Sequence, residues 1–301
     1  MKQVKSRLND LDGKEWVKST KSWFLLENGP LSKNLDKSWL VVDGKPKDIP
    51  TEIRDHPASF PPELIEKFIL FFTKKGQFVL DPFLGIGSTL EACYNTDRNG
   101  IGIELVKKYA DYSKKRVQSL LEGRLIRKNL RLQVINANAS KISELVKKHN
   151  IPKIDLCITS PPYWDMLHKT RGNVKSVLKT RIENGFDQIY SKDKEDFGNI
   201  RDYNEYLKKI STLFGEMYDI LNDKAHIIII LQNVRTPEGI MKPVAWDVAR
   251  EISKRYRLLQ EFIWVQNQKF LGCWGYPSVY VSNVHHHYCL VFQKGVRRTD
   301  A

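Results

Sequence analysis

Short apolar runs alternate with amphipathic stretches along most of the chain, and this alternation starts near residue 61. Pro61–Thr73 has apolar side chains at helical spacing and proline in its first turn, which predicts a half-buried helix. Ala225–Leu231 is a run of mostly β-branched residues without polar alternation, which is typical of a central strand buried on both faces. Strands and helices in alternation predict a mainly parallel sheet covered by helices.

The pattern predicts seven strands, and the first five are separated mainly by helices. Only a loop separates the last two strands, which suits a hairpin. The predicted fold class is therefore α/β, a three-layer sandwich with a seven-stranded, mainly parallel sheet and one antiparallel strand near the C-terminus. The predicted strands are Phe78–Leu80, Gly100–Ile103, Leu132–Ile135, Ile154–Ile158, Ala225–Leu231, Glu261–Gln266 and His287–Gln293. The predicted helices are Pro61–Thr73, one that begins near Thr89, Val106–Leu121, Ser140–His149, Tyr203–Leu221 and Val244–Tyr256.

Three regions do not fit this alternation: residues 1–50, Asp165–Arg201, and Gln268–Val284, which is rich in Gly and aromatic residues. Residues 1–50 are rich in Lys and Ser and show no clean period, so they are predicted to form an irregular extension that packs on the core through its tryptophans. Residues 51–301 form the main domain. Within it, Asp165–Arg201 is polar and poor in apolar runs, and an insertion of that length in a compact domain is usually functional or disordered.

Composition narrows the class of protein. With 41% hydrophobic residues the chain can build a core, which excludes a disordered protein. The longest apolar runs are far shorter than the roughly 20 residues of a membrane span, and the charged N-terminus does not resemble a secretory signal. The four cysteines are widely separated, so reduced thiols and a cytoplasmic location are expected. A net charge of +14 favours a polyanionic partner, most simply nucleic acid.

The first predicted strand ends at Asp81 and runs into a turn that contains Gly85 and Gly87. Glycines let the backbone bend sharply and approach a ligand, and ligands of such sheets lie at the carboxyl ends of the strands. Leu90 stands where a dinucleotide-binding motif has its third glycine, and Asp81 would repel a pyrophosphate. S-adenosylmethionine (SAM) has no phosphates and carries an ammonium group, so the pattern favours SAM over NAD. Glu104, at the end of the next strand, can accept both hydroxyls of a ribose.

The fourth predicted strand ends in a proline-rich turn, Ser160–Tyr163, at the same edge of the sheet. Two prolines remove two N–H donors, which leaves carbonyl oxygens, a hydroxyl and an aromatic ring. These groups suit an exocyclic amine, whose N–H groups need acceptors and whose ring needs a stacking surface. Methyl transfer from a sulfonium to that amine depends on positioning more than on a strong base. A base in duplex DNA would have to flip out to reach this turn.

Together, the segments His56–Pro61, Asp81–Thr89, Gly102–Glu104 and Thr159–Tyr163 resemble the SAM-dependent DNA amino-methyltransferases of restriction–modification systems. The resemblance implies a Rossmann-like methyltransferase fold in which Glu104 holds the ribose of SAM. It also implies that Ser160 and the Pro161 carbonyl hold the amine, while Tyr163 stacks on the base. The implied catalytic residues are Ser160, Pro161, Pro162 and Tyr163. The implied cofactor-binding residues are His56, Ala58, Phe60, Asp81, Pro82, Phe83, Gly85, Gly87, Ser88, Thr89, Glu104 and Asn138.

The catalytic turn of this chain begins with Ser160. In this respect it is similar to the turn that is typical of N4-cytosine enzymes in this family. The resemblance therefore implies a site-specific methyltransferase that acts on N4 of a flipped-out cytosine in double-stranded DNA, with a cognate restriction endonuclease as a candidate partner. Three alternatives stay open: methylation of N6 of adenine, methylation of an RNA base, and nucleic-acid binding without catalysis. The last is disfavoured because a binding module does not need a turn stripped of donors.

Residues around the proline-rich turn are candidates for DNA contact, and the insertion is the candidate segment for target recognition. Phosphate contacts made by its basic side chains would render binding strongly salt-dependent. No metal is predicted, since adjacent histidines at 285–287 on a strand would point to opposite faces. The candidates for DNA contact are Trp164, Lys169, Arg171, Lys175, Lys179 and Arg181.

Overall fold

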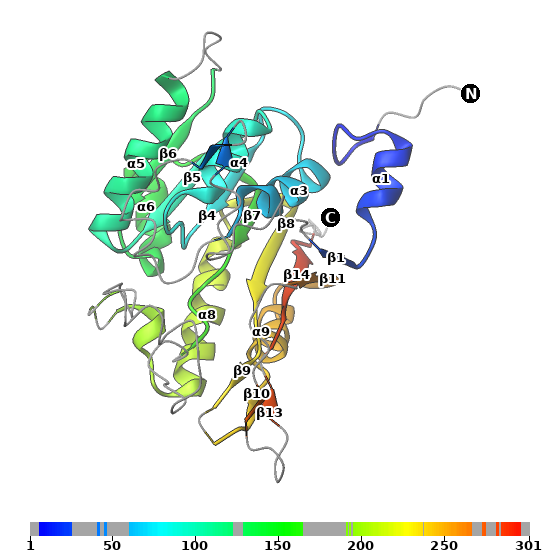
Figure 1. Cartoon of the computed structure of the whole chain (residues 1–301). Helices are drawn as coiled ribbons and strands as arrows, with labels where there is room; N and C mark the ends of the chain where they lie inside the picture. The colour runs from blue at the N-terminus through cyan, green and yellow to red at the C-terminus, as the bar shows by residue number, and fades with distance from the viewer. Residues whose placement is uncertain are drawn as a thin grey trace, which may run out of the picture.

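The computed structural model describes residues 6–25, 41–42, 45–46, 60–122, 129–164, 191, 193, 195–236, 238–266, 273–274, 281–282 and 284–295. At its centre lies an eight-stranded sheet with the order β1-β11-β14-β8-β7-β4-β5-β6 (Figure 1). The strands are β1 (Trp23–Leu25), β4 (Phe78–Asp81), β5 (Asn99–Glu104), β6 (Leu132–Asn136), β7 (Ile154–Thr159), β8 (Leu221–Leu231), β11 (Arg257–Val265) and β14 (His286–Gln293). Three small two-stranded pairs lie outside it: β2 (Val41–Val42) with β3 (Lys45–Pro46), β9 (Val234–Arg235) with β10 (Met241–Lys242), and β12 (Cys273–Trp274) with β13 (Val281–Ser282).

Strand direction in the main sheet confirms the predicted α/β class. Neighbouring strands from β8 through β7 and β4 to β5 and β6 are all parallel. β14 runs antiparallel to both of its neighbours, β8 and β11, so it is the antiparallel strand expected near the C-terminus. The sheet has one strand more than predicted, because β1 from the N-terminal region pairs with β11.

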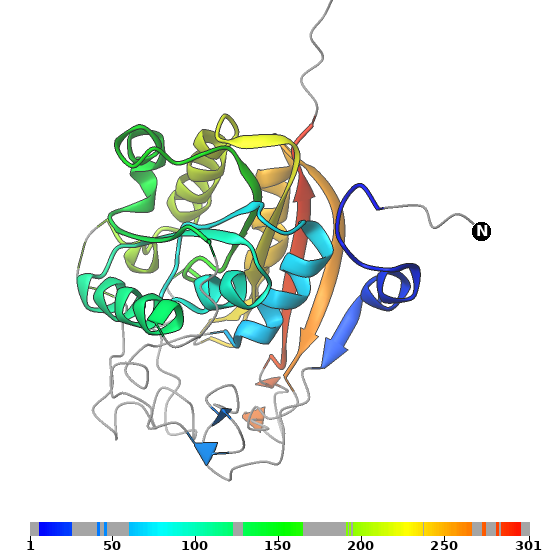
Figure 2. The same ribbon diagram turned by 90° about the horizontal axis from the view of Figure 1, so that it is seen from above.

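Helices cover both faces of the sheet (Figure 2). Side chains of β8 alternate between the two layers: Ile227, Ile229 and Leu231 pack with α8 and α9, and Ile228 and Ile230 pack with α3. This alternation explains the unbroken apolar run of β8, since both of its faces are buried. The α-helices are α1 (Gly13–Ser19), α3 (Pro62–Phe72), α4 (Ser88–Asn95), α5 (Lys107–Glu122), α6 (Ile142–Lys148), α8 (Tyr203–Met217) and α9 (Val244–Ser253), with short 3₁₀ helices η2 (Ala139–Lys141) and η4 (Phe197–Asn199).

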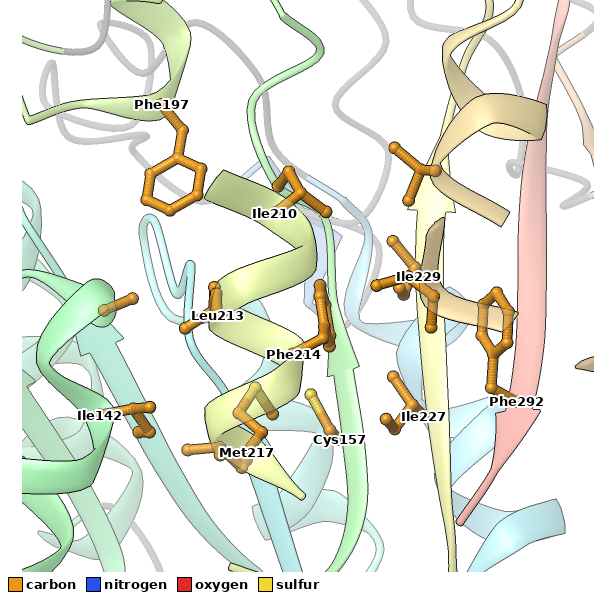
Figure 3. Packing of buried hydrophobic residues seen from close by; sticks show 14 of the residues in the cluster. Ile142, Cys157, Phe197, Ile210, Leu213, Phe214, Met217, Ile227, Ile229 and Phe292 are labelled. Carbon is orange, nitrogen blue, oxygen red and sulfur yellow. The ribbon is translucent and has the colours of Figure 1, made fainter. Parts of the chain in front are cut away.

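The larger of the two core layers forms around α8. Figure 3 shows Phe214 and Met217 of α8 directed at Cys157 of β7, with Ile227 and Ile229 of β8 beside them. All five side chains are fully buried. This layer fixes β7 and β8 side by side, and it therefore fixes where the chain leaves β7.

The N-terminal region is more regular than its sequence predicts. Asp12 and Glu15 form a reciprocal capping box at the start of α1, and the Trp16 ring lies 5.1 Å from the ring of Phe71. β1 follows, and Phe24 is buried in the layer that also contains the apolar side chains of α3. Neither element had a visible period, because α1 buries no side chain and β1 is only three residues long. None of the described helices is long and apolar enough to cross a membrane.

Candidate functional site

Three neighbouring parallel strands end in polar side chains at one edge of the sheet. β4 ends at Asp81, β5 at Glu104 and β7 at Thr159, and β4 lies between the other two. One cavity opens at this edge, between the glycine turn that follows β4 and the proline-rich turn that follows β7. The prediction that these two turns share a rim is therefore confirmed. The predicted site residues that line the cavity are Phe60, Asp81, Pro82, Phe83, Gly85, Ser88, Thr89, Glu104, Asn138, Ser160 and Pro162.

Asp81 links the two turns. Its Oδ1 accepts hydrogen bonds from Thr159 Oγ1 at 2.6 Å and from the Phe83 amide at 3.0 Å, and its Oδ2 accepts one from Thr89 Oγ1 at 2.5 Å. The carboxylate is buried. Desolvation raises its pKa, and the hydrogen bonds from Thr159, Thr89 and Phe83 oppose that rise. Asp81 thus ties the end of β7 to the start of α4.

The glycine turn is held in place by α5. Gly85 and Gly87 adopt left-handed conformations with φ of 59° and 88°, which a side chain would strain. Ser113 Oγ donates to the Gly85 carbonyl at 2.9 Å, and Arg116 Nη1 donates to the Ile86 carbonyl at 3.0 Å. Helix α5 is thus the support of the turn, a role for Ser113 and Arg116 that the sequence did not reveal.

Leu90 stands where a dinucleotide-binding motif has its third glycine, and its side chain fits there because the facing strand β5 carries glycines. A Cβ atom on Gly100 would lie 2.6 Å from Leu90 Cδ2, and one on Gly102 would lie 2.4 Å from Leu84 Cδ2. The close approach of helix and strand therefore comes from two glycines on β5 rather than from a third glycine in the turn. This arrangement brings Glu104, two residues beyond Gly102, against the turn.

Glu104 contacts the backbone of both its own loop and the glycine turn. Its Oε2 accepts from the Gly85 amide and its Oε1 from the Val106 amide, each at 2.8 Å. Burial raises the pKa of Glu104 to about 7, and the two backbone hydrogen bonds oppose this rise. A carboxylate oxygen can accept more than one hydrogen bond, so both oxygens can also accept ligand hydroxyls.

The proline-rich turn is poor in donors. Ser160 Oγ lies 3.1 Å from the hydroxyl of Tyr163, whose ring is only 7% exposed and lies 5.8 Å from the ring of His287. The Pro162 carbonyl accepts from the Tyr206 hydroxyl at 2.8 Å and from the Trp164 amide at 3.0 Å. Tyr206 on α8 therefore fixes the turn, and Tyr163 presents little of its ring in this state.

The structure buries Trp164 instead of exposing it. Its side chain is 8% exposed, its Nε1 donates to the Arg201 carbonyl at 3.1 Å, and its ring packs edge-on against Tyr203 at 5.0 Å. Burial in this core does not support the prediction that Trp164 contacts DNA. Some predicted site residues lie outside the described residues: His56, Ala58, Lys169, Arg171, Lys175, Lys179 and Arg181.

The C-terminal end of the predicted insertion returns to the cavity, which the sequence did not foretell. Asp196 and Phe197 line the cavity, and the Phe197 ring lies 5.2 Å from that of Phe83. Glu195 Oε2 accepts a hydrogen bond from Asn138 Nδ2 at 2.8 Å. A polar segment without a period gives no sequence signal for such a return. The cavity-lining residues that were not predicted are Ile65, Leu84, Ile86, Leu105, Val106, Ala139, Thr159, Asp196, Phe197 and Ile230.

His287 belongs to an aromatic cluster. Its ring stacks on Trp264 at 4.9 Å and also contacts Phe60 and Tyr163. Among the described residues no group of three or more His, Cys, Asp or Glu side chains could hold a metal ion.

The sequence matches the family model for N6/N4 DNA methylases over residues 2–115 and 154–300. The chain belongs to this DNA methylase family. Among curated proteins it is 32% identical to the orphan methyltransferase M.BamHII of Bacillus amyloliquefaciens over 45% of this chain and 51% of that protein. It is 48% identical to the type II methyltransferase M.Cfr9I of Citrobacter freundii over 21% of each. The matched segments thus span about half or less of these relatives.

Solved structures with a similar arrangement include the N-methyltransferase NodS of Bradyrhizobium japonicum WM9 in complex with S-adenosyl-L-homocysteine. The two are 8% identical, with a TM-score of 0.47 over 81% of this chain and 96% of that one. TrmN from Thermus thermophilus is 13% identical, with a TM-score of 0.46 over 79% of this chain and 50% of that one.

SAM is the cofactor of this family, and the cavity fits it chemically. The lining contains three buried carboxylates, of Asp81, Glu104 and Asp196, and among the described lining residues there is no Lys or Arg. That charge suits a cofactor with a sulfonium and an ammonium group, and it disfavours a pyrophosphate. The hydroxyl of Ser88 is buried without a hydrogen-bond partner and lines the same cavity, as expected of a group that a ligand satisfies.

Proposed function

We propose that this protein is a site-specific, SAM-dependent DNA methyltransferase that modifies an exocyclic amine, namely N4 of cytosine. The observation that carries the proposal is the hydrogen bond between Thr159 and Asp81, which joins the amine-accepting turn to the cofactor-binding turn at one cavity. Transfer between two ligands requires that both be held in contact, and a shared cavity meets that requirement.

On the cofactor side, this chain positions the donor through backbone and carboxylate groups. Glu104 accepts the ribose hydroxyls at the two oxygens that already receive the Gly85 and Val106 amides. The negative field of Asp81 attracts the ammonium end. SAM itself supplies an electrophilic methyl group on sulfonium. Because the Asp81 carboxylate is fixed by three donors, it needs no rearrangement when the cofactor enters.

On the acceptor side, the turn offers oxygen atoms and few donors. The Pro162 carbonyl is occupied by Tyr206 and Trp164, so it is not the acceptor for the amine. Among the described residues no hydrogen bond is recorded to the Pro161 carbonyl. The Ser160 hydroxyl and the Pro161 carbonyl therefore accept the two N–H groups, which directs the nitrogen lone pair at the methyl group. We propose that Tyr163 stacks on the base, which requires its ring, buried in this structure, to become accessible when the base enters.

The choice of cytosine rests on Ser160, the form typical of N4-cytosine enzymes in the resemblance described above. The same two acceptors would fit N6 of adenine, and the family model covers both activities. If no methylated DNA forms, the remaining alternatives are methylation of an RNA base and nucleic-acid binding without methyl transfer.

Recognition of duplex DNA is supported by the charge of the chain and by the place of Ser160 in the cavity wall. The net charge of +14 attracts the phosphates, and the base must leave the stack to reach Ser160. The insertion at residues 165–201 is the proposed segment for target recognition, residues 1–50 the proposed N-terminal extension, and a cognate endonuclease the proposed partner. A cytoplasmic location is consistent with the free, buried thiols of Cys93, Cys157 and Cys289.

The test is to incubate the protein with tritium-labelled SAM and duplex DNA and to digest the DNA to nucleosides. We expect label in N4-methylcytosine. Label in N6-methyladenine would replace the base assignment and retain the site. Label in RNA alone, or DNA binding without any labelled product, would overturn the proposed function.

A further inference from the structure

The segment that closes the predicted insertion brings a carboxylate and an aromatic ring into the cofactor cavity. Asp196 is 4% exposed and Phe197 is 3% exposed, and both line the cavity. The Phe197 ring meets the Phe83 ring edge-on, 5.2 Å away at 80°. A nucleobase needs flat apolar contacts and a few well-placed polar groups, and this wall of the cavity offers both.

This wall lies on the side where the adenine of SAM must lie. Glu104 is paired in register with Asn136 on β6, and the Ala137 amide donates to the Glu104 carbonyl at 3.0 Å. Asn138 directly follows Ala137 at the end of β6. In the sheet, β6 lies beyond β5, on the side away from β7 and Ser160. The sulfonium must face Ser160, so the base extends from the ribose towards Asn138.

Asn138, one of the residues implied to bind the cofactor, is already engaged. Its Oδ1 accepts from the Ser140 amide at 2.9 Å and from Ser140 Oγ at 2.8 Å. Its Nδ2 donates to Glu195 at 2.8 Å. An amide oxygen has two lone pairs, so Asn138 has no acceptor left for the exocyclic amine of adenine. Asn138 instead holds Glu195, the residue next to Asp196.

Asp196 has the acceptor capacity that Asn138 lacks. Its Oδ1 accepts from the Gly198 amide at 2.8 Å and its Oδ2 from Ser191 Oγ at 2.7 Å, which fixes the carboxylate at the start of η4. A carboxylate has about four acceptor sites and an amide oxygen has two, so Asp196 offers acceptor sites that the amide of Asn138 does not have.

We propose that Asp196 is the specificity residue for the adenine of SAM: its carboxylate accepts a hydrogen bond from the exocyclic amine, while Phe197 and Phe83 pack against the ring. This rests on the proposed function and assigns a recognition role within its cofactor site. The adenine acceptor then comes from the insertion that follows the catalytic turn, and not from the end of β6.

The test compares two ligands that differ only at the amine. The full-length protein is titrated calorimetrically with S-adenosylhomocysteine and with its analogue in which purine replaces adenine, so that the exocyclic amine is missing. The wild type should bind the adenine ligand about tenfold more tightly or better, as expected for a hydrogen bond to a charged acceptor. Asp196→Asn keeps a side chain that can cap η4 and should lose that preference, chiefly by weakening the adenine ligand.

Glu195→Gln is the matched control, because Glu195 neighbours Asp196 and holds Asn138 but does not line the cavity. It should retain the preference for adenine. A wild type that binds both ligands equally, or an Asp196→Asn protein that weakens both to the same extent, would overturn the assignment of Asp196 and leave the proposed function intact. A wild type that binds neither ligand would instead contradict the proposed function.

Discussion

The two turns at the active edge lie on neighbouring strands and are opposite in hydrogen-bonding character. The glycine turn after β4 keeps its backbone N–H groups and directs the amides of Phe83 and Gly85 at the carboxylates of Asp81 and Glu104. The proline-rich turn after β7 has lost two N–H groups at Pro161 and Pro162, and one carbonyl is fixed by Tyr206. One turn orients buried carboxylates, and the other brings Ser160 and Pro162 to the cavity wall without backbone donors at its two prolines.

The difference explains how one edge of a sheet can hold two unlike ligands together. In the proposed function, a cationic donor is attracted by carboxylates that the glycine turn orients, whereas a neutral amine is held by oxygen acceptors of a turn that has lost two backbone donors. Asp81 is the point where the two regions meet, since it accepts from Thr89 on one side and from Thr159 on the other. Substitutions at these positions should therefore affect the two regions differently.

Removal of the Asp81 carboxylate should have the largest effect. Asp81→Ala leaves two buried hydroxyls and the Phe83 amide without an acceptor, so we expect the free energy of unfolding to fall by about 3–5 kcal/mol. Denaturant unfolding measures it. Thr89→Val is the control, because it removes one donor and should cost only about 1 kcal/mol. Equal losses in both variants would contradict the linking role of Asp81.

The pH dependence of stability should report on Glu104. Its pKa is raised from 4.5 to about 7 in the folded protein, so the folded state favours the protonated form. The contribution of Glu104 to the free energy of unfolding is therefore fully present below pH 4.5. It is lost as the pH rises to about 7, by up to about 3 kcal/mol, and hydrogen bonds from ligand hydroxyls should offset this loss. Thermal unfolding of the ligand-free protein over this range measures the slope. Glu104→Gln should lose that part of the slope, and an unchanged slope would show that Glu104 titrates normally.

Removal of the Ser160 hydroxyl should slow methyl transfer without weakening the binding of SAM. Ser160→Ala should lower the methylation rate by about 100-fold, since one acceptor for the amine is lost, and leave affinity for SAM largely intact. Single-turnover kinetics and calorimetry measure the two quantities. Ser143→Ala, at an exposed serine that contacts Glu216, is the matched control. Weaker SAM binding with a normal rate would reverse the assigned roles of the turns.

The packing beneath the glycine turn should give the smallest effect. Gly102→Ala places a Cβ 2.4 Å from the Leu84 side chain and should cost about 1–2 kcal/mol, because that side chain must shift. Gly13→Ala is the control, since nothing lies within 4 Å of the added atom. Comparison of the two melting temperatures checks this, and a Gly102→Ala protein as stable as its control would show that the turn is not tightly packed on β5.

The regular part of the fold could be predicted because burial dictates its pattern. The isoleucines of β8 are buried on both faces, and the period of α3 follows its single buried face. The strand-end residues Asp81, Glu104 and Ser160 could be placed together for a topological reason, since parallel strands bring their carboxyl ends to one edge.

Contacts made by irregular segments could not be predicted in this way. Asp196 and Phe197 reach the cavity from a polar stretch whose path no periodicity specifies. β1 joins the sheet through three residues with one buried side chain, Phe24. Trp164 lies next to the catalytic turn in sequence, yet the contact with Tyr203 turns it into the core. In each case the position depends on partners distant in the sequence.

The central claim is that donor and amine meet in one cavity between the two turns. A crystal structure of the protein with bound SAM tests it most directly. The account predicts the ribose on Glu104 and the methyl group directed at the Ser160 hydroxyl, with room for one nitrogen between them. A cofactor bound away from Glu104, or one whose methyl group points away from Ser160, would contradict it.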